Sequence, residues 1–309
     1  MRVLFYGTPA FALPTLSVLL ERHTVVGVVT QPDRPAGRGQ RARPSVVKQA
    51  AVARGLPVLQ PPHLRDPEWS ERLAVLEPEV AVVVAFGQIL PQRILDVPPR
   101  GSINLHASLL PRYRGAAPVA WAIIRGERET GVSTFLIDAG MDTGPILLQR
   151  ATPIGPEETA GELAERLATL GAELMIETLD RLDAITPRPQ DAGAATPAPR
   201  LRKEDGVLDW TLPATDLAAL IRGVNPWPGG ATQGPTGRLL IWRARALAGS
   251  GEPGTLTTTG DTLSIGTGAG LLEPVLVQPE NRRAMTWEAF LRGARLGPGA
   301  RVGAPVSRR

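Results

Sequence analysis

Residues 80–85 read Val-Ala-Val-Val-Val-Ala, an unbroken apolar run in which four side chains are β-branched. A strand that is apolar at every position, not at every second one, is typical of a sheet covered on both faces. Further strand-like runs stand at 2–6, 24–30 and 101–106. Helical patterns separate the runs, at 10–21, 45–54 and 66–76. This alternation predicts an α/β fold, with a mostly parallel sheet and helices on both faces.

The 309 residues suffice for two domains, and the pattern changes after the middle of the chain. A long helix is expected over 157–182, followed at 186–199 by a Pro- and Ala-rich stretch without apolar periodicity. Short runs broken by glycine come next and favour a small β-barrel. Those runs are 238–246, 254–259, 262–265 and 274–277. We predict a first domain at 1–185, a linker at 186–204 and a second domain at 205–309.

The composition excludes several classes of protein. The chain has no cysteine, so disulfides, thiolate zinc sites and cysteine nucleophiles are ruled out, and a cytoplasmic location is expected. Its three histidines are too scattered for a clustered imidazole site, and we expect no metal. The longest apolar run, 80–86, is far shorter than the ~20 residues that a membrane span needs, so no membrane association is expected.

The net charge of +4 is unevenly distributed. Residues 31–54 carry six basic side chains and a single acid, Asp33. Residues 238–309 carry ten arginines and five acids, so the remainder of the chain is acidic. Two basic patches on an acidic body favour a polyanionic partner, because clustered arginines bind phosphates. The alternative from charge alone is an ordinary solvated surface in an arginine-rich proteome.

Three polar side chains stand out as candidates for chemistry, and two of them lie at the predicted carboxyl end of a strand, where ligands bind in such folds. Asn104 and His106 are two apart in a strand and therefore face the same side. Asp142 lies in a loop between Gly140 and Gly144. An amide, an imidazole and a carboxylate suit group transfer between two bound substrates, because the first two can hold a developing oxyanion. Taken singly, each residue has an ordinary structural reading as a loop, core or turn residue.

The flanks of these residues resemble a known family. The stretch NLHASLLPRYRGAAP at 104–118 is similar to the signature of methionyl-tRNA formyltransferases. Further similar segments are GTP at 7–9, QPDRPAGRG at 31–39, AFGQILP at 85–91, DTG at 142–144, KEDG at 203–206, DW at 209–210 and NPWPG at 225–229. The Asn/His/Asp set with the SLLP loop is typical of folate-dependent formyltransferases and hydrolases in general. The PDRPAGRG and NPWPG segments narrow the resemblance to the tRNA enzymes.

The resemblance implies transfer of a formyl group from 10-formyltetrahydrofolate to the α-amine of initiator methionyl-tRNA. It implies that Asn104 and His106 stabilise the tetrahedral oxyanion, while Asp142 sets the ionisation of His106 and helps to remove the amine proton. It also implies a Rossmann-like first domain, a smaller OB-like barrel that binds tRNA, and a monomer in the cytoplasm. No metal is implied.

Binding residues are also implied by the resemblance. The folate would lie along Phe86, Gly87, Ile89, Leu90, Ser108, Leu109, Leu110, Pro111 and Asp138; for the apolar ones, core packing is the alternative. The tRNA would contact Arg34, Arg38, Arg41, Arg43, Lys48, Arg243, Arg245, Arg282 and Arg283. Arg38, between two glycines, is expected to sense the weakly paired end of the acceptor stem. The segment 39–43 departs from the lysines and bulky apolar residue usual in the family, so the side chain that wedges against the RNA stays open.

Three alternatives remain at the level of sequence. A formyltransferase for a small amine, such as a ribonucleotide or an amino sugar, would share the Asn/His/Asp set but would need neither basic region. A formyltetrahydrofolate hydrolase would release formate without any acceptor. A non-catalytic RNA-binding protein on a degenerate enzyme scaffold would bind RNA without turnover.

Overall fold

The computed structural model describes residues 1–36, 41–235 and 237–303, with backbone alone at 35, 36, 41 and 42. Its contacts divide the chain into two units. The first consists of Met1–Pro118, Glu129–Pro153 and Ala164–Ala198, and the second of Val119–Arg128, Ile154–Leu163 and the chain from Pro199 onward. Within the described part of the chain, no helix is both long and apolar enough to cross a membrane.

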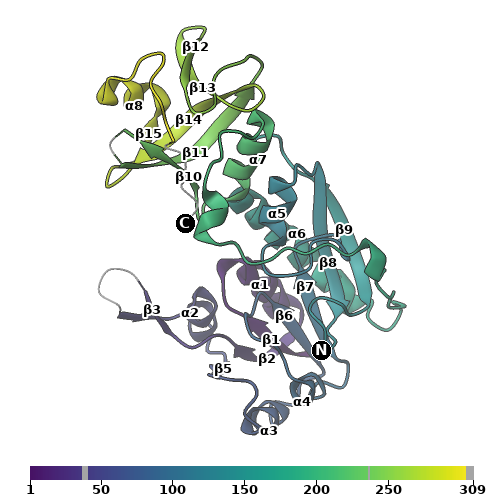
Figure 1. The fold of residues 1–309 in the computed structure, drawn as a ribbon. Helices are drawn as coiled ribbons and strands as arrows, with labels where there is room; N and C mark the ends of the chain where they lie inside the picture. The colour runs from purple at the N-terminus through teal and green to yellow at the C-terminus, as the bar shows by residue number, and fades with distance from the viewer. Residues whose placement is uncertain (37–40, 236, 304–309) are drawn as a thin grey trace. The chain divides into compact units, whose positions relative to one another are not determined.

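The first unit is built on a seven-stranded sheet of order β5-β2-β1-β6-β7-β8-β9 (Figure 1). Its strands are β1 Arg2–Gly7, β2 Thr24–Val29, β5 Val58–Leu59, β6 Val80–Val84, β7 Ser102–His106, β8 Glu129–Leu136 and β9 Ile146–Pro153. The pairings from β5 to β7 are parallel, and β8 and β9 add an antiparallel edge. The mostly parallel sheet predicted from the apolar runs is confirmed. Strands β8 and β9 were not predicted.

Helices cover both faces of this sheet. The helices of the first half are α1 Leu13–Arg22, which follows the short 3₁₀ helix η1 Ala10–Ala12, then α2 Val46–Val52, α3 Glu68–Ala74 and α4 Gln92–Leu95. On one face, Trp69 of α3 and Ile94 of α4 pack in one cluster with Tyr6 and Val83. On the other, α6 Ala160–Asp180 approaches β7 so closely at Gly171 that a Cβ there would lie 2.6 Å from Leu105. The alternation of residues along β7 therefore sends Leu105 to α6 and leaves Asn104 and His106 on the opposite face.

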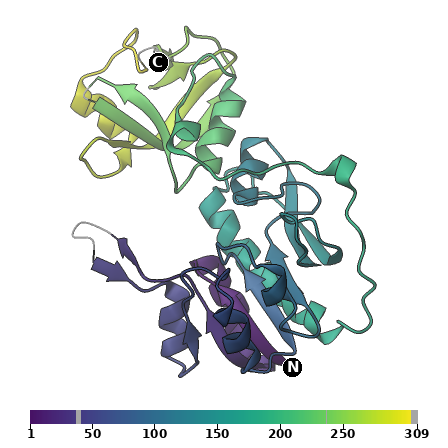
Figure 2. The same ribbon diagram turned by 60° about the horizontal axis from the view of Figure 1, so that its bottom comes forward.

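The basic segment after β2 contains two short strands, β3 Arg34–Ala36 and β4 Arg41–Arg43, which pair antiparallel as a hairpin (Figures 1 and 2). Neither strand was predicted, because Arg-Pro-Ala and Arg-Ala-Arg show no apolar alternation. Arg38 falls between them, outside the described residues.

The second unit contains an antiparallel sheet of order β10-β11-β14-β13-β12, with β15 paired to β14. Its strands are β10 Gly230–Gly234, β11 Gly237–Leu247, β12 Leu256–Thr259, β13 Thr262–Gly266, β14 Leu271–Pro279 and β15 Met285–Thr286. Its core includes Trp210, Ile241 and Trp287, with α7 Ala214–Gly223 and α8 Trp287–Ala294 packed around it. The remaining helices of the chain are α5 Pro118–Ile124, η2 Ala192–Ala194 and η3 Lys203–Gly206. The prediction of a separate β-rich second domain is thus confirmed, and the structure shows that its sheet is antiparallel.

Candidate active site

Asn104 and His106 stand at the carboxyl end of β7, on one face of the sheet. The neighbours of Asn104 across the sheet are Val83 on β6 and Phe135 on β8. The Asn104 side chain is half-buried, and no hydrogen bond joins its amide to another described residue. His106 is only 6% exposed. The structure thus places one unengaged amide and one enclosed imidazole on the same side of the strand.

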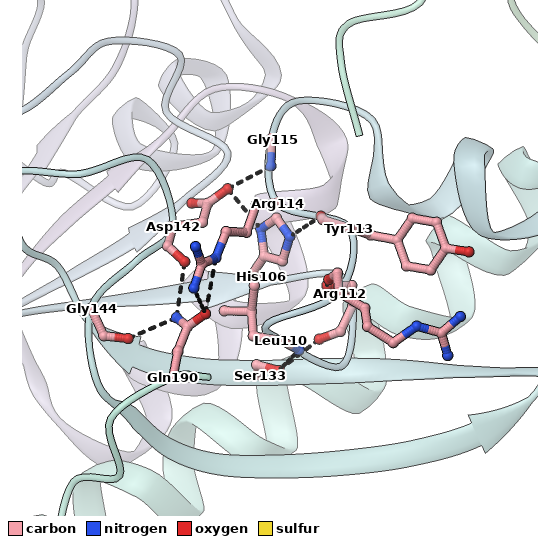
Figure 3. Close-up of polar contacts among 11 residues, drawn as sticks. His106, Leu110, Arg112, Tyr113, Arg114, Gly115, Ser133, Asp142, Gly144 and Gln190 are labelled. Atoms are coloured by element: carbon pink, nitrogen blue, oxygen red, sulfur yellow. Dashed lines mark hydrogen bonds and ion pairs between the residues drawn. The ribbon is translucent and has the colours of Figure 1, made fainter. Parts of the chain in front are cut away.

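The two ring nitrogens of His106 have different partners (Figure 3). Nε2 lies 2.8 Å from the carbonyl oxygen of Tyr113. Because a carbonyl can only accept, Nε2 carries a proton and donates it. Nδ1 faces Asp142 and lies 3.6 Å from Oδ2 of that carboxylate. Nδ1 is therefore the ring nitrogen that is not used by the backbone contact and can exchange a proton.

Asp142 is held in a backbone conformation that a residue with a side chain seldom adopts. Its φ of 54° lies in the left-handed region. The Gly115 N–H donates to its Oδ2 at 2.8 Å, and Gln190 Nε2 donates to its carbonyl at 2.9 Å. Two residues on, Gly144 packs so tightly that a Cβ would lie 1.7 Å from the Leu136 carbonyl. These contacts fix the turn that directs the carboxylate at His106.

Hydrogen bonds with side chains of β8 and β9 hold the loop after β7 in place. Ser133 donates to the carbonyl of Ser108 at 2.6 Å and accepts from the Leu110 N–H at 3.1 Å. Gln149 Nε2 donates to the Leu110 carbonyl at 2.9 Å. Ser108 itself donates to the carbonyl of Arg112 at 2.6 Å. The Ser108 hydroxyl and the Leu110 backbone are thus engaged within the loop, whereas Leu109 and Pro111 are half-buried beside it.

The other residues predicted to contact folate divide into two groups. Phe86 and Leu90 are buried in the core of the first unit, where the Phe86 ring packs edge-on against Tyr6 at 5.3 Å. Burial raises the pKa of that tyrosine well above its ordinary range. Gly87 is exposed at a φ of 87°, and Ile89 is 73% exposed. Ile89 is therefore the apolar side chain of this loop that is available to a ligand.

Asp138, also predicted to contact folate, holds the turn before Asp142. Its Oδ1 accepts from the Gly140 N–H at 3.0 Å and from the Thr143 hydroxyl at 2.6 Å. The carboxylate is exposed, so one oxygen shapes the turn and the other faces solvent.

The basic residues of the hairpin, and Lys48 of α2, differ in how far they are engaged. Arg34 and Arg43 are exposed, and Arg34 donates to Gln31 at 3.2 Å. Lys48 pairs with Asp33 at 2.7 Å. Hydrogen bonds from Lys48 and Gln60 hold the pKa of Asp33 below its ordinary value. The side chain of Arg41 and all of Arg38 lie outside the described residues.

Of the four arginines predicted to contact tRNA in the second unit, two form ion pairs with glutamates and two are exposed on a turn. Arg243 bonds to Glu162, and Arg245 to Glu157 at 3.2 Å. Hydrogen bonds from Thr159, and then from Arg243, lower the pKa of Glu162. Arg282 and Arg283 are exposed on the turn between β14 and β15.

Several residues that hold the site come from a segment predicted to be a linker. The Thr196 hydroxyl accepts from the Tyr113 N–H at 2.8 Å, and the Thr196 carbonyl accepts from the Arg114 N–H at 2.8 Å. Ala198 N–H donates to the Arg114 carbonyl at 2.7 Å. No sequence signal marks these contacts, because the Pro- and Ala-rich segment has no periodicity to align with the loop it crosses.

The chain is similar to known protein families and to curated relatives. A family model described as formyl transferase matches residues 1–179, and one described as formyl transferase, C-terminal domain, matches residues 200–295. The methionyl-tRNA formyltransferase of Citrifermentans bemidjiense is 48% identical over 307 residues, covering 98% of this chain and 96% of the relative. That of Thermus thermophilus is 49% identical over 304 residues, covering 98% and 99%.

Solved structures show the same fold at low identity. A methionyl-tRNA formyltransferase from Clostridium thermocellum matches with a TM-score of 0.58 at 18% identity, covering 89% of this chain and 99% of that one. An N-formyltransferase from Helicobacter canadensis, in complex with folinic acid and dTDP-3-aminofucose, matches with a TM-score of 0.65 at 18% identity, covering 89% and 99%. The two family models between them span most of the sequence, and the chain belongs to the formyl transferase family.

Proposed function

We propose that this chain is a methionyl-tRNA formyltransferase, which transfers the formyl group of 10-formyltetrahydrofolate to the α-amine of initiator methionyl-tRNA. The observation that carries the proposal is the contact of the His106 ring with the Asp142 carboxylate, on the face of β7 that also bears Asn104. The relatives of this chain at 48–49% identity, which it covers almost completely, carry that name.

The proposed chemistry assigns each of the three side chains a task. The amine nitrogen attacks the formyl carbon, and the bond from that carbon to the folate N10 breaks. The amine loses a proton, and N10 gains one. Negative charge develops on the formyl oxygen, where the Asn104 amide and a protonated His106 Nδ1 would donate hydrogen bonds. The Asp142 carboxylate, 3.6 Å from Nδ1, stabilises the positive ring and can take the amine proton through a water molecule.

The loop after β6 has groups that fit a folate ring. No backbone hydrogen bond joins the main-chain groups of 87–90 to another described residue, so their N–H and C=O groups are open to a polar ring edge. Ile89 projects from the same loop and offers an apolar surface. Flat, polar-edged ligands are commonly held by this combination of backbone and apolar contacts.

Replacing Ile89 with serine should raise KM for 10-formyltetrahydrofolate by about 10-fold, because burying an Ile against a ligand is worth about 1.5–3 kcal/mol. Ile89 is 73% exposed, so Tm should stay within 1–2 °C of the wild-type value, roughly the shift expected from a surface substitution. The matched control is Val75→Ser, since Val75 is 81% exposed beside the end of α3. Equal KM values for both variants, measured by steady-state kinetics, would contradict the assignment.

Contacts to tRNA are proposed for the hairpin and for the second unit. Arg43 is exposed and makes no ion pair with a described residue, and Arg282 and Arg283 are likewise open. Lys48, Arg243 and Arg245 already hold carboxylates, so any contact that they make to phosphate would compete with those ion pairs. Among the described side chains, we therefore give Arg43, Arg282 and Arg283, with Arg34, the main share of the proposed tRNA contacts. The contacts proposed for Arg38 and Arg41 fall on side chains outside the described residues.

Replacing Arg43 with glutamine should raise KM for methionyl-tRNA about threefold and leave kcat unchanged. One lost phosphate contact should also reduce the slope of log KM against log salt concentration by about 0.7–0.9. The control is Arg72→Gln on α3, where the arginine stands 3.8 Å from Glu68 in an exposed i,i+4 pair. A salt slope that falls equally in both variants would argue against a specific contact at Arg43.

The deciding experiment offers the purified chain 10-formyltetrahydrofolate with four acceptors in parallel. These are initiator methionyl-tRNA, elongator methionyl-tRNA, a dTDP-linked amino sugar, and water, with formate release as the last readout. The proposal expects formylation of the initiator tRNA well above the rest. Preferred formylation of the sugar would indicate a formyltransferase for a small amine. Formate release alone would indicate a hydrolase, and RNA binding without turnover would indicate a non-catalytic RNA-binding protein.

A further inference from the structure

Gln190 uses the full hydrogen-bonding capacity of its side-chain amide. Its Nε2 donates to two carbonyl oxygens, that of Asp142 at 2.9 Å and that of Gly144 at 2.7 Å. Its Oε1 accepts from Nε of Arg114 at 3.1 Å and from Nη2 of the same guanidinium at 2.7 Å (Figure 3). Two donors and two acceptor sites exhaust what an amide offers. The amide can therefore point only one way, and it has no polar atom left for a substrate.

The partners of Gln190 belong to the two loops that hold the His106 ring. The loop at 138–144 supplies the carboxylate that faces Nδ1. The loop at 112–115 supplies the Tyr113 carbonyl that accepts from Nε2, and the Gly115 N–H that donates to Asp142. Gln190 lies in a different part of the chain and connects one loop to the other. A change at Gln190 thus reaches both partners of the imidazole without touching the ring.

The conformation of Asp142 needs such support. A non-glycine residue at a φ of 54° persists where the surrounding contacts hold it there. Gln190 donates to the main-chain carbonyl of Asp142 and to that of Gly144, two positions later. It therefore fixes the backbone of the turn. The Gly115 N–H donates to the side-chain carboxylate of Asp142 and so fixes the other end of the same residue.

From these contacts we propose that Gln190 is a positioning residue, which keeps the Asp142 carboxylate directed at Nδ1 of His106. The inference rests on the proposed function in that Asp142 and His106 are taken as the reacting pair. Gln190 itself touches neither substrate and is not a catalytic residue.

Gln190→Glu is the sharpest variant, because it keeps the size of the side chain and its acceptor for Arg114. It replaces the two N–H donors with an oxygen that faces two carbonyl oxygens, so the contacts to Asp142 and Gly144 become repulsive. We expect kcat to fall on the order of 10- to 100-fold, the loss that a misplacement of about 1 Å produces. KM for both substrates should stay within about twofold, since no substrate contact is removed.

Asp191→Ala is the matched control in the same segment. The Asp191 carboxylate accepts only from the N–H of Gly193, at 2.8 Å, among the described contacts and caps its own short turn. This variant should keep wild-type kcat. If it loses as much activity as Gln190→Glu, the segment acts as general structural support and the positioning role is wrong.

A double-mutant cycle separates positioning from structural damage. Asp142→Asn should by itself lower kcat about 100-fold, the lower end of the range for a group that assists proton transfer, and leave tRNA binding nearly intact. If Gln190 acts through Asp142, the double variant Gln190→Glu/Asp142→Asn is no slower than Asp142→Asn alone. A double variant slower by the product of the two single losses would overturn the inference.

A second readout does not depend on which reaction the enzyme performs. The chain has three histidines, so the ring-nitrogen chemical shifts of His106 can be assigned by NMR through His106→Ala. The inference expects these shifts to move in Gln190→Glu in the same sense as in Asp142→Asn, and to stay in place in Asp191→Ala. Unmoved shifts overturn it even in an active enzyme. Moved shifts uphold it even if the wild-type chain fails to formylate methionyl-tRNA, which would refute the proposed function alone.

Discussion

His106→Ala should lower kcat for methionyl-tRNA formylation by about 10³- to 10⁴-fold. A positioned acid or base contributes about 10²- to 10⁴-fold, and the proposed ring serves both proton exchange and charge stabilisation. Nε2 is held by the Tyr113 carbonyl at 2.8 Å, so the ring is oriented before any substrate arrives and Nδ1 is presented to the reaction. KM for the tRNA should change little, because the ring is 6% exposed and is not part of the basic surface.

The variant should still fold, which makes the measurement interpretable. Truncation removes the hydrogen bond from His106 to the Tyr113 carbonyl, at a cost of about 1–3 kcal/mol, against the 5–15 kcal/mol of an ordinary domain. Steady-state kinetics well below the measured Tm will therefore report chemistry. His63→Ala, which removes an exposed histidine, is the control and should keep wild-type kcat. Added imidazole should restore part of the activity of His106→Ala, and a kcat within tenfold of the wild type without imidazole would refute the role.

The core of the first unit could be predicted from sequence because its strands are apolar at every position. Runs such as 80–84 can be stable only where both faces are covered, so the pattern alone indicates a parallel sheet between helices. Strand β8 does not show this apolar pattern, because Ser133 and Thr134 are buried polar residues within it. Their hydroxyls are satisfied from distant parts of the chain, by the loop at Ser108 and by Thr178 of α6. A local pattern cannot show partners that are far away in sequence.

The same distinction separates the parts of the site that the sequence predicts from those that it does not. Asn104 and His106 follow from the two-residue period of a strand, and the structure places His106 against Asp142. Gln190 is an isolated polar residue in a stretch without periodicity, so only the three-dimensional contacts reveal what it holds. Phe86 is an apolar residue in a loop motif, and its sequence context fits a ligand surface and a core position equally well. The structure shows its ring buried against Tyr6, and the predicted folate contact stays a prediction.

Asn104→Ala should lower kcat by about 10²- to 10³-fold, the usual loss when one oxyanion donor is removed, with almost no change in Tm. The absence of a stability effect follows from the structure, because the amide forms no hydrogen bond with a described residue and is half-buried. Asn104→Asp should be slower still, since a carboxylate would repel the charge that develops on the formyl oxygen. Kinetics and thermal unfolding of the same preparations test both statements.

Ser102→Ala is the matched control for Asn104, two residues earlier on the same face of β7. The Ser102 hydroxyl is buried and has no partner among the described residues, so its removal should leave Tm unchanged or raise it and should not alter kcat. If Asn104→Ala instead lowers Tm and kcat together, the amide supports the fold and is not an oxyanion donor. Combination with His106→Ala gives a further check, because two donors to one oxyanion act as a unit and their losses should fall well short of multiplying.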